Sequence, residues 1–235
     1  MHQRSECVSA PGIANKSAGN PVAAVKKSCE LYVRVEAGNP AGWPDLERAV
    51  GFARPSALLI TNIGAATDAA SLRAFMAAAR RLDLAVMLEN DIHLAKELDA
   101  DGVHLRADSE ALAEARLLLG EAKSIGTSCV LSRHEAMTMA EGGADYIAFG
   151  EFDALGDANA ADVAEMIDWW AEIFEVPCVA WVREQWSEDE LRGIVAARPD
   201  YLSVALGAGD AAEGAQHYAA VAELVGARAG LTLPA

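Results

Sequence analysis

The sequence contains few cysteines, and none of them lies in a Cys-x-x-Cys pair. The four are scattered along 235 residues, at Cys7, Cys29, Cys129 and Cys178. This spacing is typical of reduced thiols, because a disulfide framework or a zinc site needs cysteines in closely spaced sets. We therefore expect no metal site built from cysteine.

Long apolar runs are also missing. No stretch reaches the roughly 18 residues that cross a bilayer, and residues 1–28 hold no apolar segment of signal-peptide type. We expect a cytoplasmic protein without a membrane partner.

Positive charge is scarce, because 19 Lys and Arg residues stand against 35 Asp and Glu residues, for a formal net charge of −16. Nucleic-acid-binding proteins need an excess of cations on one face, so we expect no nucleic-acid partner. A small phosphorylated molecule is compatible with this charge only where specific cations lie at its site, since the overall field repels anions. The sequence leaves the oligomeric state open, a homo-oligomer included.

The beginning of the chain differs in composition from the rest. Residues 1–28 are rich in Ser, Ala, Gly, Asn and Pro without a hydrophobic period, so we expect residues 1–29 to form a disordered tail. The whole chain is 52% hydrophobic, which suffices for one full core in the remaining segment. We therefore predict a single domain at residues 30–235.

Short β-branched or apolar runs alternate with amphipathic helical segments along this domain. Eight such runs are candidate strands, at residues 30–37, 56–62, 84–90, 101–105, 123–128, 144–150, 176–182 and 200–206. Their spacing is that of one strand plus one crossover helix. Eight strands that each feed a helix close into a (β/α)₈ TIM barrel, an α/β fold. We prefer this to an open doubly wound sheet, because no Gly-x-Gly-x-x-Gly turn follows the first strand.

The helices carry clear start and stop signals. Apolar residues recur at helical spacing on one face, at Leu72, Phe75, Met76, Ala79 and Leu82, and again at Leu112, Ala115 and Leu119 before Gly120. Ser132 with Glu135, and Ser187 with Glu190, have the spacing of capping boxes. These boxes predict where the loops after the fifth and seventh strands end.

A TIM barrel places its active site at the carboxyl ends of the strands. The residues at those ends are Glu36, Asn62, Glu89, Asn90, His104, Arg106, Ser128, Glu151, Arg183 and the segment 207–209. Arg106 and Arg183 can each hold a phosphate or carboxylate through a bidentate fork, or pair with a nearby acid. His104 is either a hydrogen-bonded core histidine or a catalytic base. Asp108 and Ser109 precede a helix and have the default role of capping it.

Two stretches carry a family resemblance. "ELDADGVHLRADSEALAEARLLLGEAKSIGTS" and "EAMTMAEGGADYIAFGEF" resemble the middle of the thiamine phosphate synthase and TenI family of TIM barrels, in order and spacing, from about Leu84 to Phe152. The resemblance implies thiamine biosynthesis: a hydroxymethylpyrimidine diphosphate is joined to a thiazole phosphate, with magnesium, to give thiamine phosphate.

The expected ligand-binding residues of that family are largely replaced. Its diphosphate-binding Arg and Lys fall in Ile60-Thr61-Asn62-Ile63, its two magnesium aspartates fall on Asn90 and Ser109, and its Gly-Gly-Ile phosphate loop becomes Trp181-Val182-Arg183. Its serine after the fifth strand and its glycine after the sixth are kept as Ser128 and Gly150. Magnesium is expected here only if Glu89 or Asp108 substitutes for the missing carboxylates. The predicted substrate-binding residues are Asn62, Asn90, Arg106, Ser128, Gly150 and Arg183.

Three functions stay open at this point. The first is a phosphate-ligand transferase with relocated cations. The second is a non-catalytic barrel that binds a ligand or partner, which fits the bulky Trp181 and Trp186 around the former phosphate loop. The third is a thiazole tautomerase of the TenI kind, although that enzyme's histidine aligns with Val130.

Overall fold

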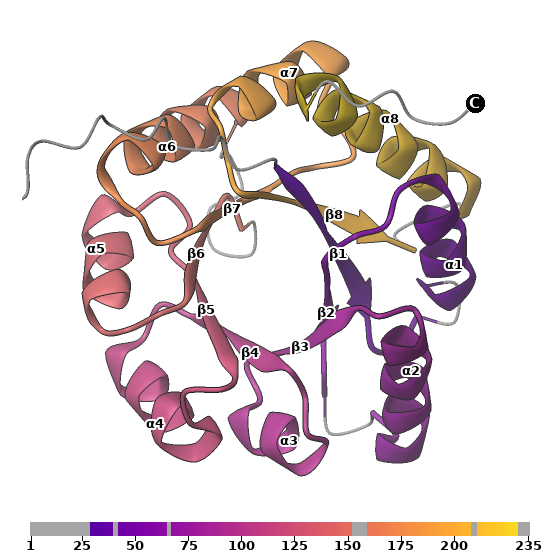
Figure 1. Ribbon diagram of the computed structural model, residues 1–235, viewed down its shortest axis with the longest axis vertical. Coiled ribbons are helices and arrows are strands. Elements are labelled where there is room, and N and C mark those ends of the chain that lie inside the picture. Colours follow the sequence, from indigo (N-terminus) through magenta and orange to yellow (C-terminus); the bar gives the residue numbers. More distant parts are fainter. Residues whose placement is uncertain (1–28, 40–41, 65–66, 152–158, 208–210, 230–235) are drawn as a thin grey trace, which may run out of the picture.

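The computed structural model describes residues 29–39, 42–64, 67–151, 159–207 and 211–229. The eight predicted strands are all present and close into a parallel barrel in sequence order, with β8 paired to β1 (Figure 1). The TIM-barrel prediction is thereby confirmed. The strands are β1 (Glu30–Glu36), β2 (Ala57–Thr61), β3 (Ala85–Glu89), β4 (Gly102–Arg106), β5 (Ser124–Ser128), β6 (Tyr146–Phe149), β7 (Cys178–Trp181) and β8 (Tyr201–Leu206).

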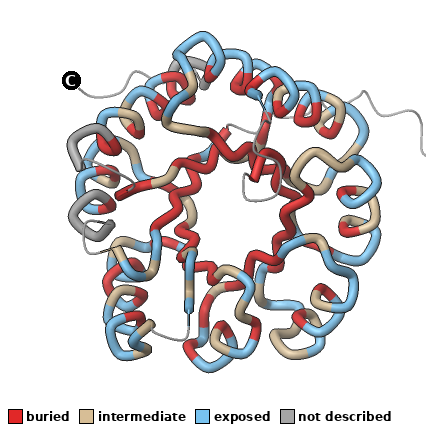
Figure 2. Tube along the Cα trace, turned by 180° about the vertical axis from the view of Figure 1, so that it is seen from behind, coloured by how far each residue is buried: buried red, intermediate tan, exposed pale blue. Residues whose placement is uncertain are grey.

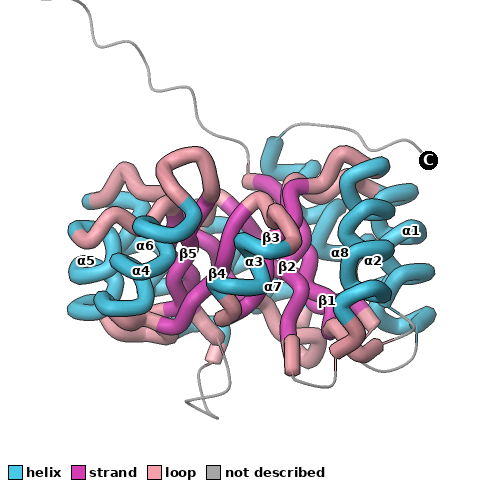
Figure 3. Tube along the Cα trace, turned by 90° about the horizontal axis from the view of Figure 1, so that it is seen from below, coloured by secondary structure: helices cyan, strands magenta, loops and turns pink. Residues whose placement is uncertain are grey.

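A helix follows each strand, and the helices form an outer ring around the barrel (Figures 1 and 3). Right-handed crossovers between neighbouring parallel strands produce this arrangement. The helices are α1 (Gly42–Phe52), α2 (Ala69–Arg81), α3 (Ile92–Glu97), α4 (Ser109–Leu119), α5 (Arg133–Glu141), α6 (Ala160–Ile173), α7 (Glu188–Ala196) and α8 (Ala211–Ala229).

The caps agree with the sequence signals. Ser187 and Glu190 form a complete capping box at α7, while the Ser132 side chain accepts the Glu135 N–H at α5, which is one half of the predicted box. Gly120 ends α4 with a positive φ of 77°. Asp108 caps the same helix and accepts from two backbone N–H groups of its first turn.

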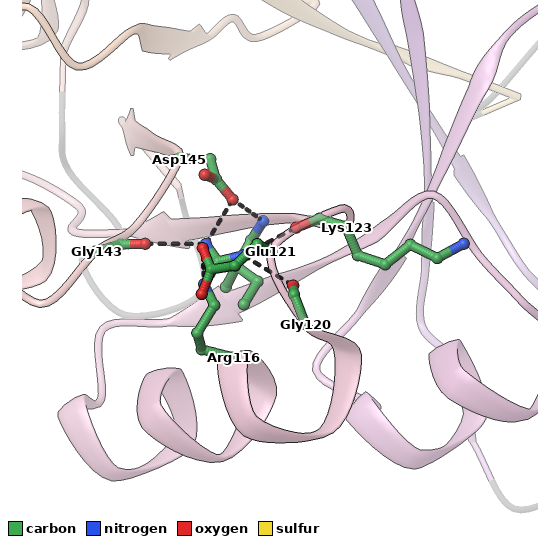
Figure 4. Close-up of polar contacts among 7 residues, drawn as sticks. Arg116, Gly120, Glu121, Lys123, Gly143 and Asp145 are labelled. Carbon is green, nitrogen blue, oxygen red and sulfur yellow. Dashed lines mark hydrogen bonds and ion pairs between the residues drawn. The ribbon is translucent and has the colours of Figure 1, made fainter.

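An aspartate stands immediately before three of the strands at the amino end of the barrel. Asp101, Asp145 and Asp200 precede β4, β6 and β8, and each accepts a backbone N–H from the neighbouring strand, at 2.7 to 2.9 Å. Asp145 also accepts a hydrogen bond from the Arg116 guanidinium, which donates to the carbonyl oxygens of Gly120 and Gly143 as well (Figure 4). This arrangement fixes the register of the strands at the end opposite to the expected site.

The hydrophobic core has two parts. The larger part lies between the strands and the helices, and the inner ring of buried residues in Figure 2 marks the barrel wall that it covers. The smaller part fills the barrel interior with Tyr32, Leu59, Met87, Ala148, Val179 and Trp181. Alternate strand residues face these two parts because side chains of a strand point to opposite faces.

The interior is not filled evenly from one end to the other. At the amino end, small residues such as Ala57 and Ala85 leave a cavity of about 230 Å³ that is also lined by Tyr201. Higher in the barrel, Gly126 makes room for Tyr146, since an added Cβ would lie 1.9 Å from that ring. Tyr32, Tyr146 and Tyr201 also line this cavity.

The predicted tail falls almost entirely outside the described residues. Cys29, at its last position, is 5% exposed and packs into the larger core. Within the part of the chain that the structure describes, no helix combines the length and apolar character needed to cross a membrane. Trp170 is a core residue and Trp169 packs partly buried against the core, whereas the Trp43 side chain is outside the description.

Candidate functional site

The carboxyl ends of the strands converge on one mouth of the barrel. Arg106 and Ser128 end neighbouring strands and lie opposite one another in the β4–β5 register. Arg106 is exposed, whereas Ser128 is buried and its Oγ has no hydrogen-bond partner in the structure as described. A cation and a hydroxyl without a hydrogen-bond partner among the described residues therefore lie side by side at the mouth, and their role in binding stays a prediction.

The two predicted asparagines are turn residues. Asn62 and Asn90 follow β2 and β3 with positive φ angles of 54° and 52°, a conformation that asparagine tolerates better than most residues. The Asn90 side chain accepts the Arg106 N–H at 3.0 Å, and the Asn62 N–H donates to Glu89 at 2.9 Å. These bonds hold the rim of the mouth, and a role in binding substrate stays a prediction.

Gly150, just past β6, is required by the backbone. Its φ is +91°, and an added Cβ would lie 2.9 Å from a Val163 methyl group and 3.2 Å from the Trp181 carbonyl oxygen. Its N–H donates to the carbonyl oxygen of Val130, a β-branched residue that itself has a positive φ of 48°. Strain of this kind is found at functional sites.

Arg183 is half-buried two residues beyond β7. Its carbonyl oxygen accepts the N–H of Trp186, which closes a turn before α7. Arg183 therefore lies at the rim on the side of the barrel opposite to Arg106, because β4 and β7 are separated by β5 and β6. The structure does not bring these two arginines into one contact.

Sequence reasoning missed the most deeply placed cation. Arg34 lies inside β1 and is 8% exposed. Its guanidinium stacks over the Trp181 ring, at 4.1 Å from the ring centre, and donates to the Val182 carbonyl oxygen at 3.1 Å. The signal was present, because strand alternation places Arg34 on the interior face together with Tyr32.

A hydrogen-bonded column of rings continues from Trp181 into the barrel. His104 lies 5.6 Å from Trp181 and stacks on Tyr146. The His104 Nδ1 is 3.0 Å from the Tyr146 hydroxyl, which is 3.0 Å from that of Tyr32. Burial, with a smaller contribution from the charge of Arg34, lowers the pKa of His104 to about 3. His104 is therefore a neutral, hydrogen-bonded interior histidine.

Burial also governs the two tyrosines of the column. Desolvation raises the pKa of Tyr146 well above its usual value. It raises the pKa of Tyr32 as well, against the opposing hydrogen bond from Tyr146. Both hydroxyls therefore stay protonated, and the column carries hydrogen bonds without charge.

Two acidic residues at the mouth, Asp108 and Glu89, accept hydrogen bonds from backbone N–H groups. One oxygen of Asp108 accepts both N–H groups that it caps, and one oxygen of Glu89 accepts the Asn62 N–H. Across the described ranges, no group of three or more His, Cys, Asp or Glu side chains could hold a metal. Magnesium prefers near-octahedral oxygen ligands that include one or two carboxylates, and magnesium at Glu89 or Asp108 stays a prediction.

These features define a (β/α)₈ barrel with polar and charged residues at the carboxyl ends of its strands, where barrels of this kind place their active sites. Comparison with known proteins identifies the family. A profile described as thiamine monophosphate synthase matches residues 61–181. The thiamine-phosphate synthase of Rhodospirillum centenum is 35% identical over 158 residues, which cover 65% of this chain and 76% of that protein. The chain belongs to the thiamine monophosphate synthase family.

Two further relatives extend the comparison. The thiamine-phosphate synthase of Erythrobacter litoralis is 41% identical over 143 residues, which cover 58% of this chain and 66% of that protein. Among solved structures, a thiamine phosphate pyrophosphorylase from Pyrococcus furiosus superposes with a TM-score of 0.66 at 20% identity, covering 86% of this chain and 97% of that one. At that identity the structural likeness supports the fold alone.

Proposed function

We propose that this barrel binds a small phosphorylated molecule of thiamine biosynthesis at its mouth and has lost the magnesium-dependent joining reaction. The observation that carries the proposal is that side-chain oxygens at the mouth already accept hydrogen bonds from backbone N–H groups. Asn90 occupies a position where the resemblance implies a metal-binding aspartate, and its side-chain oxygen instead holds the Arg106 N–H. Asp108 caps α4.

The free energy that the missing family contacts would contribute supports the proposed loss of the joining reaction. A charge-assisted hydrogen bond contributes roughly 1.5 to 3 kcal/mol. Four missing contacts therefore correspond to about 6 to 12 kcal/mol, or about four to nine powers of ten. Arg106 and Ser128 lie side by side at the mouth and can hold a phosphate group, which favours retained binding over retained turnover.

The test is formation of thiamine phosphate from hydroxymethylpyrimidine diphosphate and thiazole phosphate with magnesium. The Erythrobacter litoralis enzyme serves as the active reference, and thermal shift with thiamine phosphate measures binding in parallel. We expect a rise in melting temperature with a rate at least about 10⁴-fold below the reference. A rate within tenfold of the reference contradicts the proposal.

A transferase with a rebuilt site is the second candidate, and Arg34 favours it. This buried cation lies inside the barrel beneath the mouth and can replace part of the charge that the missing Arg and Lys would supply. The turnover assay separates the two candidates, because only the transferase releases product.

A further inference from the structure

The cavity at the amino end of the barrel lies at the end opposite to the mouth. Five of the residues that line it are the first residues of their strands, namely Ala57, Ala85, Ser124, Tyr146 and Tyr201. Its volume is about 230 Å³, which exceeds the roughly 150 Å³ of an engineered apolar cavity that takes up benzene. The amino end therefore has room for one small ring.

The wall of this cavity is mainly apolar and partly aromatic. Met87 and Val179 are its buried apolar residues, at 3% and 1% exposure. Tyr32, Tyr146 and Tyr201 add three phenol rings, and the first two meet edge to face, with 6.1 Å between their ring centres. An aromatic ligand suits such a wall, because contacts between rings stabilise a complex beyond the apolar area that they bury.

Polar groups at the edge of the cavity select the kind of ring. One carboxylate oxygen of Asp145 accepts both the Ile125 N–H, at 2.7 Å, and the Arg116 guanidinium, at 2.8 Å (Figure 4). The other oxygen accepts no hydrogen bond within the described part of the chain, and the hydroxyls of Ser124 and Tyr201 likewise bond to no described residue. A ligand with an O–H or N–H donor can therefore bond to Asp145.

The charges at the cavity disfavour an ionic ligand. An anion would be repelled by the Asp145 carboxylate and would lose its hydration, since no Lys or Arg is among the described residues that line the cavity. A cation would find Asp145 already paired with Arg116. The cavity therefore suits an uncharged molecule.

We infer that the amino end of the barrel holds a second binding site, which takes a small uncharged aromatic molecule with an O–H or N–H donor, of the size of phenol or indole. The ring packs against the tyrosines and Met87, and the donor bonds to the second oxygen of Asp145. This inference goes beyond the proposed function, because the site needs no phosphate and lies at the other end of the barrel.

The Met87 methyl resonance, assigned with Met87→Leu, measures binding directly in protein labelled with ¹³C at the methionine methyl groups. We expect phenol and indole each to move this resonance in a saturable way, and to give a nuclear Overhauser effect between the phenol ring protons and the Met87 methyl group. Benzoate, an anion with the same ring, should leave the resonance in place. Toluene, which lacks the donor, should bind at least about threefold more weakly than phenol.

Ala85→Leu and Ala57→Leu test the position of the site, because each adds a larger side chain to the wall of the cavity from one of two paired strands. Ala85 is exposed, so its replacement should not disturb the core. Ala70→Leu is the matched control, since Ala70 is exposed on α2 and does not line the cavity. We expect phenol to bind Ala70→Leu as it binds the wild type, and both cavity variants at least about tenfold more weakly.

Three results would overturn the inference. They are the absence of a saturable Met87 shift in the wild type, an equal shift at the other methionine methyl groups, and unchanged phenol affinity in Ala85→Leu and Ala57→Leu. Toluene bound as tightly as phenol would overturn the hydrogen bond to Asp145. None of these results bears on thiamine phosphate binding at the mouth, so the proposed function stands or falls separately.

Discussion

The Arg34 guanidinium lies 4.1 Å from the centre of the Trp181 ring. This contact joins β1 to β7 across the barrel interior, and it places a large side chain at the strand end where the resemblance implies a phosphate loop of small residues. The position of the Trp181 side chain therefore affects both the stability of the barrel and the space for a ligand at that strand end.

Trp181 fills the carboxyl half of the interior and is 6% exposed. Trp181→Ala should lower the free energy of unfolding by about 3 to 5 kcal/mol, because it removes a buried ring and leaves a cavity. Urea denaturation followed by circular dichroism measures this loss. Trp181→Phe keeps most of the apolar contact and should cost clearly less. Equal losses in both variants would mean that the indole N–H, rather than the ring volume, is what matters.

The pH dependence of stability should carry the signature of His104. Its pKa is about 3 in the folded protein against about 6.5 when unfolded. A depressed pKa means that the unfolded chain binds the proton first, so this contribution is complete above pH 6.5 and is lost as the pH falls toward 3. Between pH 7 and pH 4 the loss is about 3 kcal/mol.

His104→Gln lacks this titration, so its stability should fall less than that of the wild type over the same pH range in urea denaturation. His93→Gln is the control, because His93 is an exposed histidine. If the free energy of unfolding falls equally between pH 7 and pH 4 in the wild type and in His104→Gln, the histidine is not held neutral in the folded protein.

The aspartates at the amino end should stabilise the barrel without affecting the mouth. Asp145→Ala removes the acceptor of a buried strand N–H and of Arg116, so we expect a loss of about 1 to 3 kcal/mol in unfolding free energy. Asp168→Ala removes a surface ion pair with Arg198 and should cost under about 1 kcal/mol. Chemical denaturation compares the two, and similar losses would refute the special role of Asp145.

The rim cations give a separate prediction. Because Arg106 and Arg183 lie on different sides of the mouth, one of the variants Arg106→Ala and Arg183→Ala should weaken thiamine phosphate binding by about ten- to a hundredfold, through loss of a charge-assisted contact worth roughly 1.5 to 3 kcal/mol. Arg106 is exposed, so its removal should change the melting temperature little. Fluorescence titration measures both affinities. Unchanged affinity in both variants rejects the rim as the binding surface.

Much of the fold could be predicted, because each strand carries its own local signal. Alternating apolar runs, helix caps and glycine ends act over a few residues, and they identified all eight strands, the helix end at Gly120 and the helix start at Ser187. The parallel closure follows from the regular spacing alone.

The site could be predicted less completely, for two physical reasons. Arg34 stands within an apolar strand, and only strand alternation, applied to a charged residue, would have placed it inside the barrel. Asn62 and Asn90 were recognised by position, but their left-handed backbone and the bonds that they make depend on contacts between strands. Such contacts exist only once the barrel has closed.

The most direct test of the account is a calorimetric titration of the wild-type protein with thiamine phosphate, in the presence and in the absence of magnesium. Because Asn90 and Asp108 are engaged in backbone hydrogen bonds, the account predicts saturable binding whose affinity is the same, within about threefold, under both conditions. Binding that appears only with magnesium, and that Glu89→Gln or Asp108→Asn abolishes, would show that the metal site has moved rather than gone and would contradict the central claim.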